Sequence, residues 1–396
     1  MLNSEAVQSV MSDEYRSGFY RPEGFFDGLS LPGYGDETPV TREAFAYDFY
    51  PARGAENSNV DKKSGIAEKS GATEGSDSNK SSSVEPAPLL IWVHGGAWRF
   101  GTNQGLREVD IMTPEGPRTN RQTLMRRTLQ EHGWAVASIN YRYSHQAIFP
   151  GDLHDVKEAV RFFRARAAEF GIDPERIAIA GGSAGGHLSM MAALTGPDTA
   201  GYAGGDPELH EYYEGRASSS YPAVSSTVAA AVPFYGVSDL RTIFTDRPLA
   251  GYALDHPEDD GAEWRLLGCD YPLSEEHEWV EHVPGIGRER AAQNWERAHP
   301  LDLARGVHAS GPTGETCTDK QSKEHTTSGK SAPIMLVHGI ADSCVPYQQS
   351  ARVYQALRAR QTPTDMVLVP GAEHGDPRCF TPEIVQRMLP VGEATV

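Results

Sequence analysis

A serine enclosed by glycines directly after an apolar run constrains this chain more than any other feature. Residues 176–180 (RIAIA) predict a buried strand, and the five residues that follow, GGSAG, match the pattern G-x-S-x-G around Ser183. A serine hydroxyl is a poor nucleophile, so it must stand exposed on a sharp turn where a base can take its proton. Gly181 and Gly185 leave room for such a turn. The spacing therefore predicts a strand, a turn that presents Ser183 as a nucleophile, and an amphipathic helix directly after it.

Strand-like and helix-like patterns alternate along most of the chain. Apolar runs predict strands at 89–94, 134–140, 176–180, 228–235, 334–338 and 366–369. Helical spacing predicts helices at 121–132, 152–170, 347–360 and 382–389, and one after Ser183 with Leu188, Met191, Ala192 and Thr195 on one face. Asp152 is expected to cap the second helix and Gly171 to end it. The alternation predicts an α/β fold, with a mostly parallel central sheet covered by helices on both faces.

Residues 1–396 are expected to form a single domain with two kinds of interruption. Stretches 53–86 and 306–331 are of low complexity, cannot bury enough apolar surface to offset their ordering entropy, and are predicted to be mobile insertions. Segments 199–223 and 245–300 do not fit the alternation and are rich in aromatic residues. Such excursions tend to overhang an active site, so they are predicted to be cap-like. The alternative is that their aromatic side chains only anchor long loops. These aromatic residues are Tyr202, Tyr212, Tyr213, Tyr221, Trp264, Tyr271, Trp279 and Trp295.

Composition narrows the range of partners. The formal net charge is −18 and the pI is about 5.2, so nucleic acid and anionic membranes would be repelled. The arginines at Arg126–Arg127 and at Arg161, Arg164 and Arg166 are expected on solvated helix faces. The N-terminus lacks the pattern of a signal peptide, and no run approaches the ~20 apolar residues of a spanning helix. A cytoplasmic protein is therefore expected.

Cysteine, histidine and glycine spacing favours neither a metal nor a cofactor. The four cysteines are sparse and lack any CxxC spacing, and the histidines show no HExxH pattern. No strand is followed by GxGxxG, which excludes the usual dinucleotide loop. We therefore expect no metal and no cofactor.

The segment His94-Gly95-Gly96-Ala97-Trp98 follows the first predicted strand of this pattern. Acyl transfer places negative charge on the former carbonyl oxygen, and backbone N–H groups of a glycine-rich turn can point at that oxygen without obstruction. The predicted oxyanion hole consists of Gly95 or Gly96 together with Ala184, which follows the nucleophile. His94 precedes the nucleophile in the chain, where the order Ser–Asp–His has no place for a base, so its role is predicted to be structural.

The acid and the base of a triad should follow the nucleophile in that order. Asp342 lies on the loop after the strand at 334–338, and His374 lies on the loop after the strand at 366–369. His374 is predicted to accept the proton of Ser183, while Asp342 holds the imidazole and stabilises its charged form. Asp239, on the loop after the strand at 228–235, remains a rival for the acid.

Together, the segments HGGAW, GGSAGG, HGIADSCVP and GAEHG resemble the α/β-hydrolase superfamily. The resemblance covers roughly residues 45–389, apart from the insertions and the aromatic excursions. More narrowly, the chain resembles the hormone-sensitive-lipase-like esterases and the feruloyl-esterase and arylformamidase-like carboxylesterases. The segment Asn140-Tyr141-Arg142 and the DPERI segment before the nucleophile fit the latter group. Hormone-sensitive-lipase relatives usually have HGGG and GDSAGG, where this chain has Ala97 and Gly182.

The resemblance implies an α/β-hydrolase fold and a serine carboxylesterase that acts on short-chain or aromatic esters through an acyl-enzyme. The expected partner is a small-molecule ester, aromatic or sugar-linked, with Trp98 and Tyr141 as substrate contacts. The same triad can cleave an amide, as in arylformamidases or dipeptidyl-type peptidases. From a different class, a non-catalytic binding protein on a hydrolase scaffold is the remaining alternative.

Overall fold

The computed structural model describes residues 15–22, 40–53, 85–108, 110–113, 116–196, 207–252, 261–268, 287–310, 315–318 and 332–393. The two predicted mobile insertions lie largely outside these residues. So do parts of both predicted cap segments, including Tyr202, Tyr271 and Trp279.

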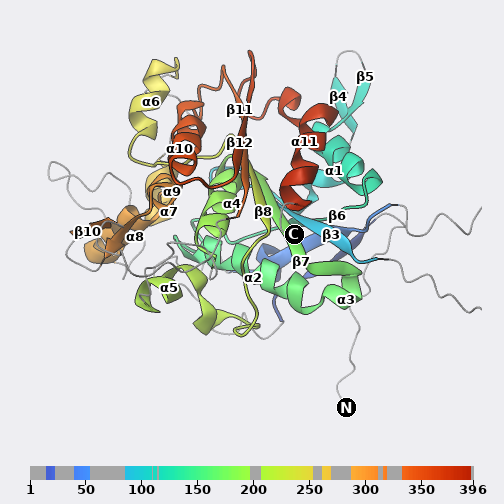
Figure 1. The fold of residues 1–396 in the computed structure, drawn as a ribbon, viewed down its shortest axis with the longest axis horizontal. Coiled ribbons are helices and arrows are strands. Elements are labelled where there is room, and N and C mark those ends of the chain that lie inside the picture. The colour runs from blue at the N-terminus through green and yellow to red at the C-terminus, as the bar shows by residue number, and fades with distance from the viewer. Residues whose placement is uncertain are drawn as a thin grey trace, which may run out of the picture.

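An eight-stranded sheet forms the centre of the structure (Figure 1). The strands of the chain are β1 (Arg16–Phe19), β2 (Ala46–Tyr50), β3 (Ala87–Val93), β4 (Asp110–Thr113), β5 (Gly116–Thr119), β6 (Ala135–Ile139), β7 (Ile172–Gly182), β8 (Ala230–Phe234), β9 (Val307–Ser310), β10 (Glu315–Thr318), β11 (Ile334–Gly339) and β12 (Thr364–Val369). Their order in the sheet is β1-β2-β6-β3-β7-β8-β11-β12. The six strands from β6 to β12 are parallel, whereas β1 and β2 add an antiparallel edge. The remaining strands form the separate pairs β4–β5 and β9–β10.

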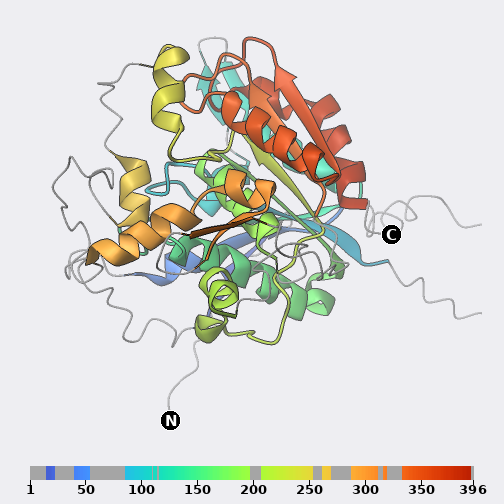
Figure 2. The same cartoon turned by 60° about the vertical axis from the view of Figure 1, so that its left-hand side comes forward.

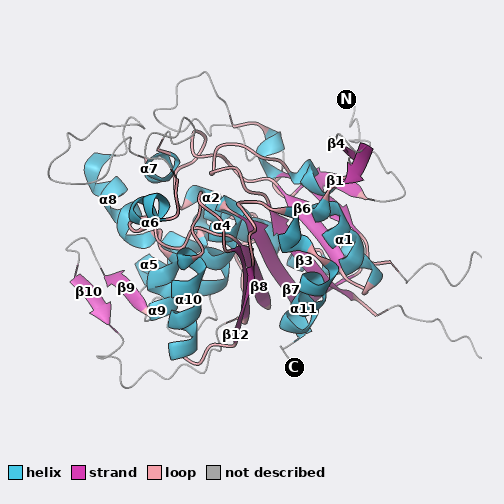
Figure 3. Cartoon of the chain, turned by 90° about the horizontal axis from the view of Figure 1, so that it is seen from above, coloured by secondary structure: helices cyan, strands magenta, loops and turns pink. Residues whose placement is uncertain are grey.

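Helices cover both faces of this sheet. They are α1 (Arg121–Glu131), α2 (Gly151–Ala165), α3 (Ala167–Phe170), α4 (Ala184–Leu194), α5 (Pro207–Glu214), α6 (Ile243–Leu249), α7 (Ala262–Leu267), α8 (Gly287–Arg297), α9 (Pro300–Arg305), α10 (Gln348–Ala359) and α11 (Pro382–Glu393). Figures 1 and 3 show α4 and α10 on one side of the parallel strands and α1 and α11 on the other. The predicted α/β architecture, with a mostly parallel sheet between two helical layers, is confirmed.

Alternate side chains of each central strand feed two separate hydrophobic cores. In β3, Leu89, Ile91 and Val93 pack with residues of α2 and α4, while Leu90 and Trp92 pack with residues of α1 and α11. A strand buried on both faces needs apolar residues at every position, because successive side chains point to opposite faces. For this reason the sequence of β3 is apolar at every position from residue 89 to residue 93.

Two local expectations were wrong. The helix after Ser183 is not amphipathic, since every residue of α4 is buried. It packs on β7 and β8 and is covered by α2 and α9, so it has no solvent face to carry polar residues. Asp152 does not cap α2: the helix begins at Gly151, Pro150 holds the cap position, and Asp152 lies in the first turn with Oδ1 accepting the Leu153 N–H at 2.8 Å.

The predicted cap segments contain α5, α7, α8 and all of α6 except its first two residues. Figure 2 shows α6, α7 and α8, drawn in yellow to orange, gathered on one side of the molecule. Trp264 of α7 stacks between Phe244 and Trp295, with ring centroids 4.9 Å apart in each pair. Tyr212 and Tyr213 of α5 are buried. The aromatic side chains of the described cap residues therefore anchor these helices on one another and on the core.

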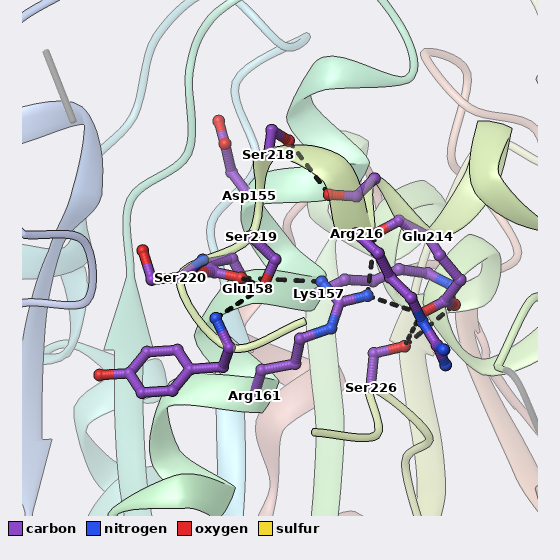
Figure 4. Close-up of polar contacts among 12 residues, drawn as sticks. Asp155, Lys157, Glu158, Arg161, Glu214, Arg216, Ser218, Ser219, Ser220 and Ser226 are labelled. Atoms are coloured by element: carbon purple, nitrogen blue, oxygen red, sulfur yellow. Dashed lines mark hydrogen bonds and ion pairs between the residues drawn. The ribbon is translucent and has the colours of Figure 1, made fainter. Parts of the chain in front are cut away.

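A buried charge cluster joins α2 to Glu214, the last residue of α5, and we call it the Glu214 cluster (Figure 4). Lys157 donates to Oε1 of Glu214, and Nη2 of Arg161 donates to Oε2 at 2.6 Å. Ser226 donates to the same carboxylate at 2.8 Å. The three charged side chains are at most 1% exposed. Burial alone would raise the pKa of Glu214, but the charges of Lys157 and Arg161 outweigh it and hold this pKa at about 2.

The expectation that the arginines lie on solvated faces was wrong for Arg161 and Arg126, whereas the side chains of Arg127 and Arg166 are more than a third exposed. Arg161 is fully buried against Glu214, and Arg126 is fully buried with Nε donating to the Leu106 carbonyl at 3.0 Å. A buried guanidinium is tolerated only with paired charge and satisfied hydrogen bonds. Glu214 is 53 residues from Arg161 along the chain, so helical spacing alone could not indicate this pair.

Replacing Glu214 by Gln is expected to lower the free energy of unfolding by about 3–5 kcal/mol, because Lys157 and Arg161 would stay buried after losing the carboxylate that both of them bind, and Arg161 would keep only its longer contact with Glu158 at 3.7 Å. Urea unfolding followed by circular dichroism measures this loss. Glu169→Gln is the matched control, since it breaks the exposed Arg166–Glu169 pair and should cost less than about 1 kcal/mol. Equal losses in the two variants would contradict a stabilising role for the cluster.

Candidate active site

The carboxyl ends of five adjacent parallel strands bring the candidate residues together. His94 follows β3, Ser183 follows β7 and Tyr235 follows β8. Asp342 follows β11 and His374 follows β12. Because parallel strands all end at the same edge of the sheet, residues that are far apart in the chain meet there.

Ser183 occupies a sharp turn between β7 and α4. Its backbone has φ 56° and ψ −119°, a region that non-glycine residues rarely adopt. Its N–H donates to the carbonyl of Phe234 at 3.0 Å, which ties the turn to β8. Glycine is required around it: a Cβ at Gly185 would lie 2.1 Å from the Val93 carbonyl oxygen, and one at Gly181 would lie 2.5 Å from the Gly185 oxygen. The strained turn can form only because these neighbours lack side chains.

A chain of hydrogen bonds links the three residues of the predicted triad. Nε2 of His374 lies 3.0 Å from Oγ of Ser183, and Nδ1 of His374 lies 2.8 Å from Oδ2 of Asp342. An ionised carboxylate can only accept, so Nδ1 carries the proton and Nε2 faces the serine as an acceptor. This tautomer is the one in which an imidazole can remove a proton from Ser183.

Asp342 is buried and held from several directions. Its Oδ1 accepts the N–H of Val345 at 2.8 Å, and Nε2 of His338 lies 3.5 Å from its Oδ2. Burial raises the pKa of this carboxyl, but hydrogen bonds to His338 and His374 outweigh that effect and lower the pKa to about 2. Asp342 is therefore an anion throughout the neutral range, as the partner of a developing imidazolium must be.

Asp239, the rival acid, has other partners. Its Oδ1 accepts from the N–H and Nε of Arg241, at 3.0 and 2.9 Å, and lies 3.3 Å from Nδ1 of His299. Nη2 of Arg241 also donates to Oδ2 of Asp302 at 2.7 Å. Asp239 thus belongs to an ion-pair group that fixes the start of α9. The structure brings Asp342, and not Asp239, into hydrogen bonding with His374.

Backbone N–H groups suitable for an oxyanion lie beside Ser183. A Cβ at Gly95 would lie 2.8 Å from the Gly182 oxygen and 3.3 Å from Cβ of Ser183, so this glycine is in direct contact with the turn. Gly96 has φ 113°, and a Cβ there would lie 2.0 Å from the Phe100 carbonyl oxygen. Ala184 is the first residue of α4, where an N–H has no acceptor within the helix.

The His94 side chain is hydrogen-bonded to this loop and helps to hold it in place. It is buried, Nδ1 donates to the Gly95 carbonyl at 2.7 Å, and its ring stacks on Tyr141 at 4.5 Å. Burial lowers the pKa of His94 to about 4, although the hydrogen bond to Gly95 acts in the opposite direction. His94 is therefore neutral near pH 7 and has no contact with the serine hydroxyl that a base would need.

Trp98 and Tyr141 differ from their expected role as substrate contacts. Both are buried, with exposed fractions of 2% and 0%. The indole N–H of Trp98 donates to Nδ1 of His187 at 3.3 Å, and the Tyr141 hydroxyl donates to the His94 carbonyl at 3.2 Å. These partners fix both side chains next to the predicted oxyanion loop, where almost none of their surface is exposed.

The sequence did not indicate that His338 and Tyr235 lie next to the triad. His338 lies beneath Asp342 and is held by Ser350 at 2.7 Å and by the Val345 carbonyl at 2.6 Å. Tyr235 places its ring 4.9 Å from that of His374. Each sits at the end of a strand, a position that the sequence does show, but nothing in their residue type indicates which neighbour they contact.

Among the described residues, no group of three or more His, Cys, Asp or Glu side chains is arranged to hold a metal ion. The same part of the chain contains no helix that is long and apolar enough to span a bilayer.

Two protein-family models together match most of the chain. Residues 78–283, more than half of it, match the BD-FAE family. Residues 310–383 match the prolyl oligopeptidase family. Asp342 and His374 lie in the second matched range, and Ser183 lies in the first.

Individual relatives that are named esterases are also similar to this chain. Esterase LipQ of Mycobacterium tuberculosis (strain ATCC 25618 / H37Rv) is 38% identical over 154 residues, which are 39% of this chain and 29% of LipQ. Esterase LipC of the same organism is 27% identical over 294 residues, which are 74% of this chain and 54% of LipC. The chain therefore spans between about a third and about half of the length of these relatives.

Solved structures share this architecture. A truncated carbohydrate esterase from gut microbiota superposes with a TM-score of 0.55 at 21% identity and covers 98% of both chains. A bifunctional GH43-CE protein of Bacteroides eggerthii superposes with a TM-score of 0.53 at 23% identity, over 92% of this chain and 37% of that chain. These similarities show the fold.

Proposed function

Because this chain belongs to the BD-FAE family, we propose that it is a serine carboxylesterase that hydrolyses short-chain or aromatic esters through an acyl-enzyme. The observation that carries the proposal is the hydrogen-bonded series Ser183–His374–Asp342, at 3.0 and 2.8 Å, next to the glycine loop of Gly95 and Gly96. A binding protein would need neither the strained serine nor the buried anion behind the histidine.

In the proposed reaction, Nε2 of His374 removes the hydroxyl proton of Ser183 as Oγ attacks the ester carbonyl. The carbonyl oxygen becomes an oxyanion, which the N–H groups of Gly95 or Gly96 and of Ala184 stabilise by about 3–4 kcal/mol for each donor. His374 then gives its proton to the departing alcohol, and the acyl group remains on Ser183. Water, deprotonated by His374, attacks this acyl-enzyme and releases the acid. Asp342 keeps the proton on Nδ1 throughout.

Apolar side chains beside the site support a small, apolar or aromatic substrate. Phe100 is 60% exposed, and its ring carbon Cδ2 lies 2.9 Å from where a Cβ at Gly96 would be. Ile340 is 44% exposed and lies two residues before Asp342. Large exposed apolar side chains next to Gly96 and close to Asp342 in the chain favour an acyl or alcohol group that buries them.

An amide hydrolase is the second candidate, and the match of residues 310–383 to the prolyl oligopeptidase family favours it. The same triad chemistry cleaves both bonds, so geometry around Ser183 does not separate them. The leaving group separates the two reactions, because an amine cannot depart without receiving a proton, whereas p-nitrophenolate can leave as the anion.

The expected substrate profile is faster turnover of p-nitrophenyl acetate and p-nitrophenyl ferulate than of p-nitrophenyl octanoate, with p-nitroacetanilide slowest. Values of kcat/KM measured side by side test this order. Equal values for all three esters would remove the proposed preference. A higher value for the anilide than for the acetate ester would favour the amide hydrolase.

A further inference from the structure

Tyr235 is a buried aromatic residue between the nucleophile turn and the imidazole of His374. It directly follows β8 and is 4% exposed. Its backbone has φ 39°, in the left-handed region that non-glycine residues seldom occupy, and its N–H donates to the Val337 carbonyl of β11 at 2.8 Å. A strained backbone is kept only where the surroundings fix it. The ring of Tyr235 is thus held in one place by β8 and β11.

Gly182 is what makes room for this ring. A Cβ at Gly182 would lie 2.8 Å from the Tyr235 hydroxyl oxygen, 3.0 Å from Cε2 and 3.1 Å from Cζ. All three of the nearest atoms belong to Tyr235, so a side chain at position 182 and the Tyr235 ring cannot share this space. Gly182 is also the residue at which GGSAGG departs from the GDSAGG of hormone-sensitive-lipase relatives. Its lack of a side chain therefore has a local consequence in this chain.

His374 needs a third contact besides its two hydrogen bonds. Its side chain is 26% exposed and stands on a loop, where swinging toward solvent would break both bonds at once. The bonds to Asp342 and Ser183 fix the two nitrogens but not the tilt of the ring. The Tyr235 ring lies 4.9 Å away with an interplanar angle of 66°, an edge-to-face arrangement that stabilises aromatic pairs.

We propose that Tyr235 is a positioning residue for the proposed esterase reaction: its ring, admitted by Gly182, holds the His374 imidazole toward Ser183. The inference rests on the proposed function, since it concerns the base of that reaction. The ring and not the hydroxyl performs this task. The hydroxyl lies at Gly182 and makes a hydrogen bond with Gln122 instead.

Tyr235→Leu tests the role of the ring. It is expected to lower kcat on p-nitrophenyl acetate by about ten- to a hundredfold, because a small misplacement of a catalytic group costs that much. KM should stay within about twofold, since no substrate contact is removed. Tyr235→Phe keeps the ring and should recover kcat to within about threefold of wild type. A loss in the Phe variant as large as in the Leu variant would overturn the assignment to the ring.

Tyr47→Leu is the matched control for lost packing. Tyr47 is a buried tyrosine of β2 whose ring contacts Phe162, Phe163 and Phe170, away from the triad. It should lower the midpoint of thermal unfolding without changing kcat. If Tyr47→Leu and Tyr235→Leu lower kcat alike, Tyr235 acts through general stability, and the inference is wrong.

Gly182→Ala probes the same contact from the other side. The added methyl group should displace the Tyr235 ring and lower kcat, and the loss should be smaller in a Tyr235→Phe background, where the nearest atom is absent. Equal fold-losses in both backgrounds would contradict the contact.

The rate at which diethyl p-nitrophenyl phosphate modifies Ser183 separates this inference from the proposed function. This modification needs the His374 base but no ester turnover, so Tyr235→Leu should slow it even if the natural substrate is an amide. A wild-type protein that neither turns over esters nor reacts with the phosphate would contradict both the proposed function and the role of Tyr235. If the wild-type protein reacts normally and Tyr235→Leu reacts equally fast, only the role of Tyr235 is contradicted.

Discussion

Replacing Ser183 by Ala is expected to lower kcat for p-nitrophenyl acetate by about 10⁶-fold, because the attacking oxygen is absent. A residual acceleration of about 10³–10⁴ over water should persist, since the oxyanion donors and the binding surface remain. The exchange removes one oxygen atom from a turn held by backbone bonds, so the unfolding midpoint should hardly change. Initial rates and thermal unfolding of the purified variant measure both quantities.

The companion variant for this result is His374→Ala. Ser183 and His374 act as one unit, so the double variant should be no slower than either single variant. If the double variant lost activity by the product of the two single fold-losses, the two side chains would act independently. A Ser183→Ala protein with wild-type turnover would contradict the mechanism altogether.

Replacing Asp342 by Asn is expected to lower kcat by about 10⁴-fold. The amide removes the negative charge that stabilises the imidazolium and can donate to Nδ1, which turns His374 into the wrong tautomer. The carboxyl is ionised down to a pKa of about 2, so wild-type activity should not fall through its titration between pH 5 and 8. A pH series of kcat in wild type and variant measures both effects.

Asp239→Asn is the matched control for this exchange. It has the same chemistry and is also at the carboxyl edge of the sheet, but its partners are Arg241 and His299. It should weaken that ion-pair group and lower stability while changing kcat less than about tenfold. If Asp239→Asn were the more damaging of the two, the acid would have been misassigned.

The sequence was most informative where function depends on local order. Ser183 follows an apolar strand and precedes a helix, and Asp342 and His374 each stand on the loop after a strand. Once the strands are parallel, these three loops must meet at one edge, so their proximity follows from topology. The antiparallel edge formed by β1 and β2 was missed, because short edge strands lack a long apolar run.

The sequence was least informative where a side chain depends on a distant partner. Arg161 has the spacing of a solvated helix face, yet it is buried against Glu214 at the end of α5. Trp98 directly follows the predicted oxyanion loop in the sequence and Tyr141 follows β6, but their polar atoms hydrogen-bond to His187 and to the His94 carbonyl. Which face of a loop an aromatic ring takes is decided by packing, and a single sequence does not carry that information.

Covalent trapping of Ser183 tests the central claim most directly. Wild-type protein treated with diethyl p-nitrophenyl phosphate should release one equivalent of p-nitrophenol, lose its esterase activity in step, and carry the diethylphosphoryl group on the peptide that contains Ser183. Ser183→Ala should release none, and Asp342→Asn should react far more slowly. Inactivation with the adduct on another residue, or equal labelling of Ser183→Ala, would contradict the assignment of Ser183 as the nucleophile.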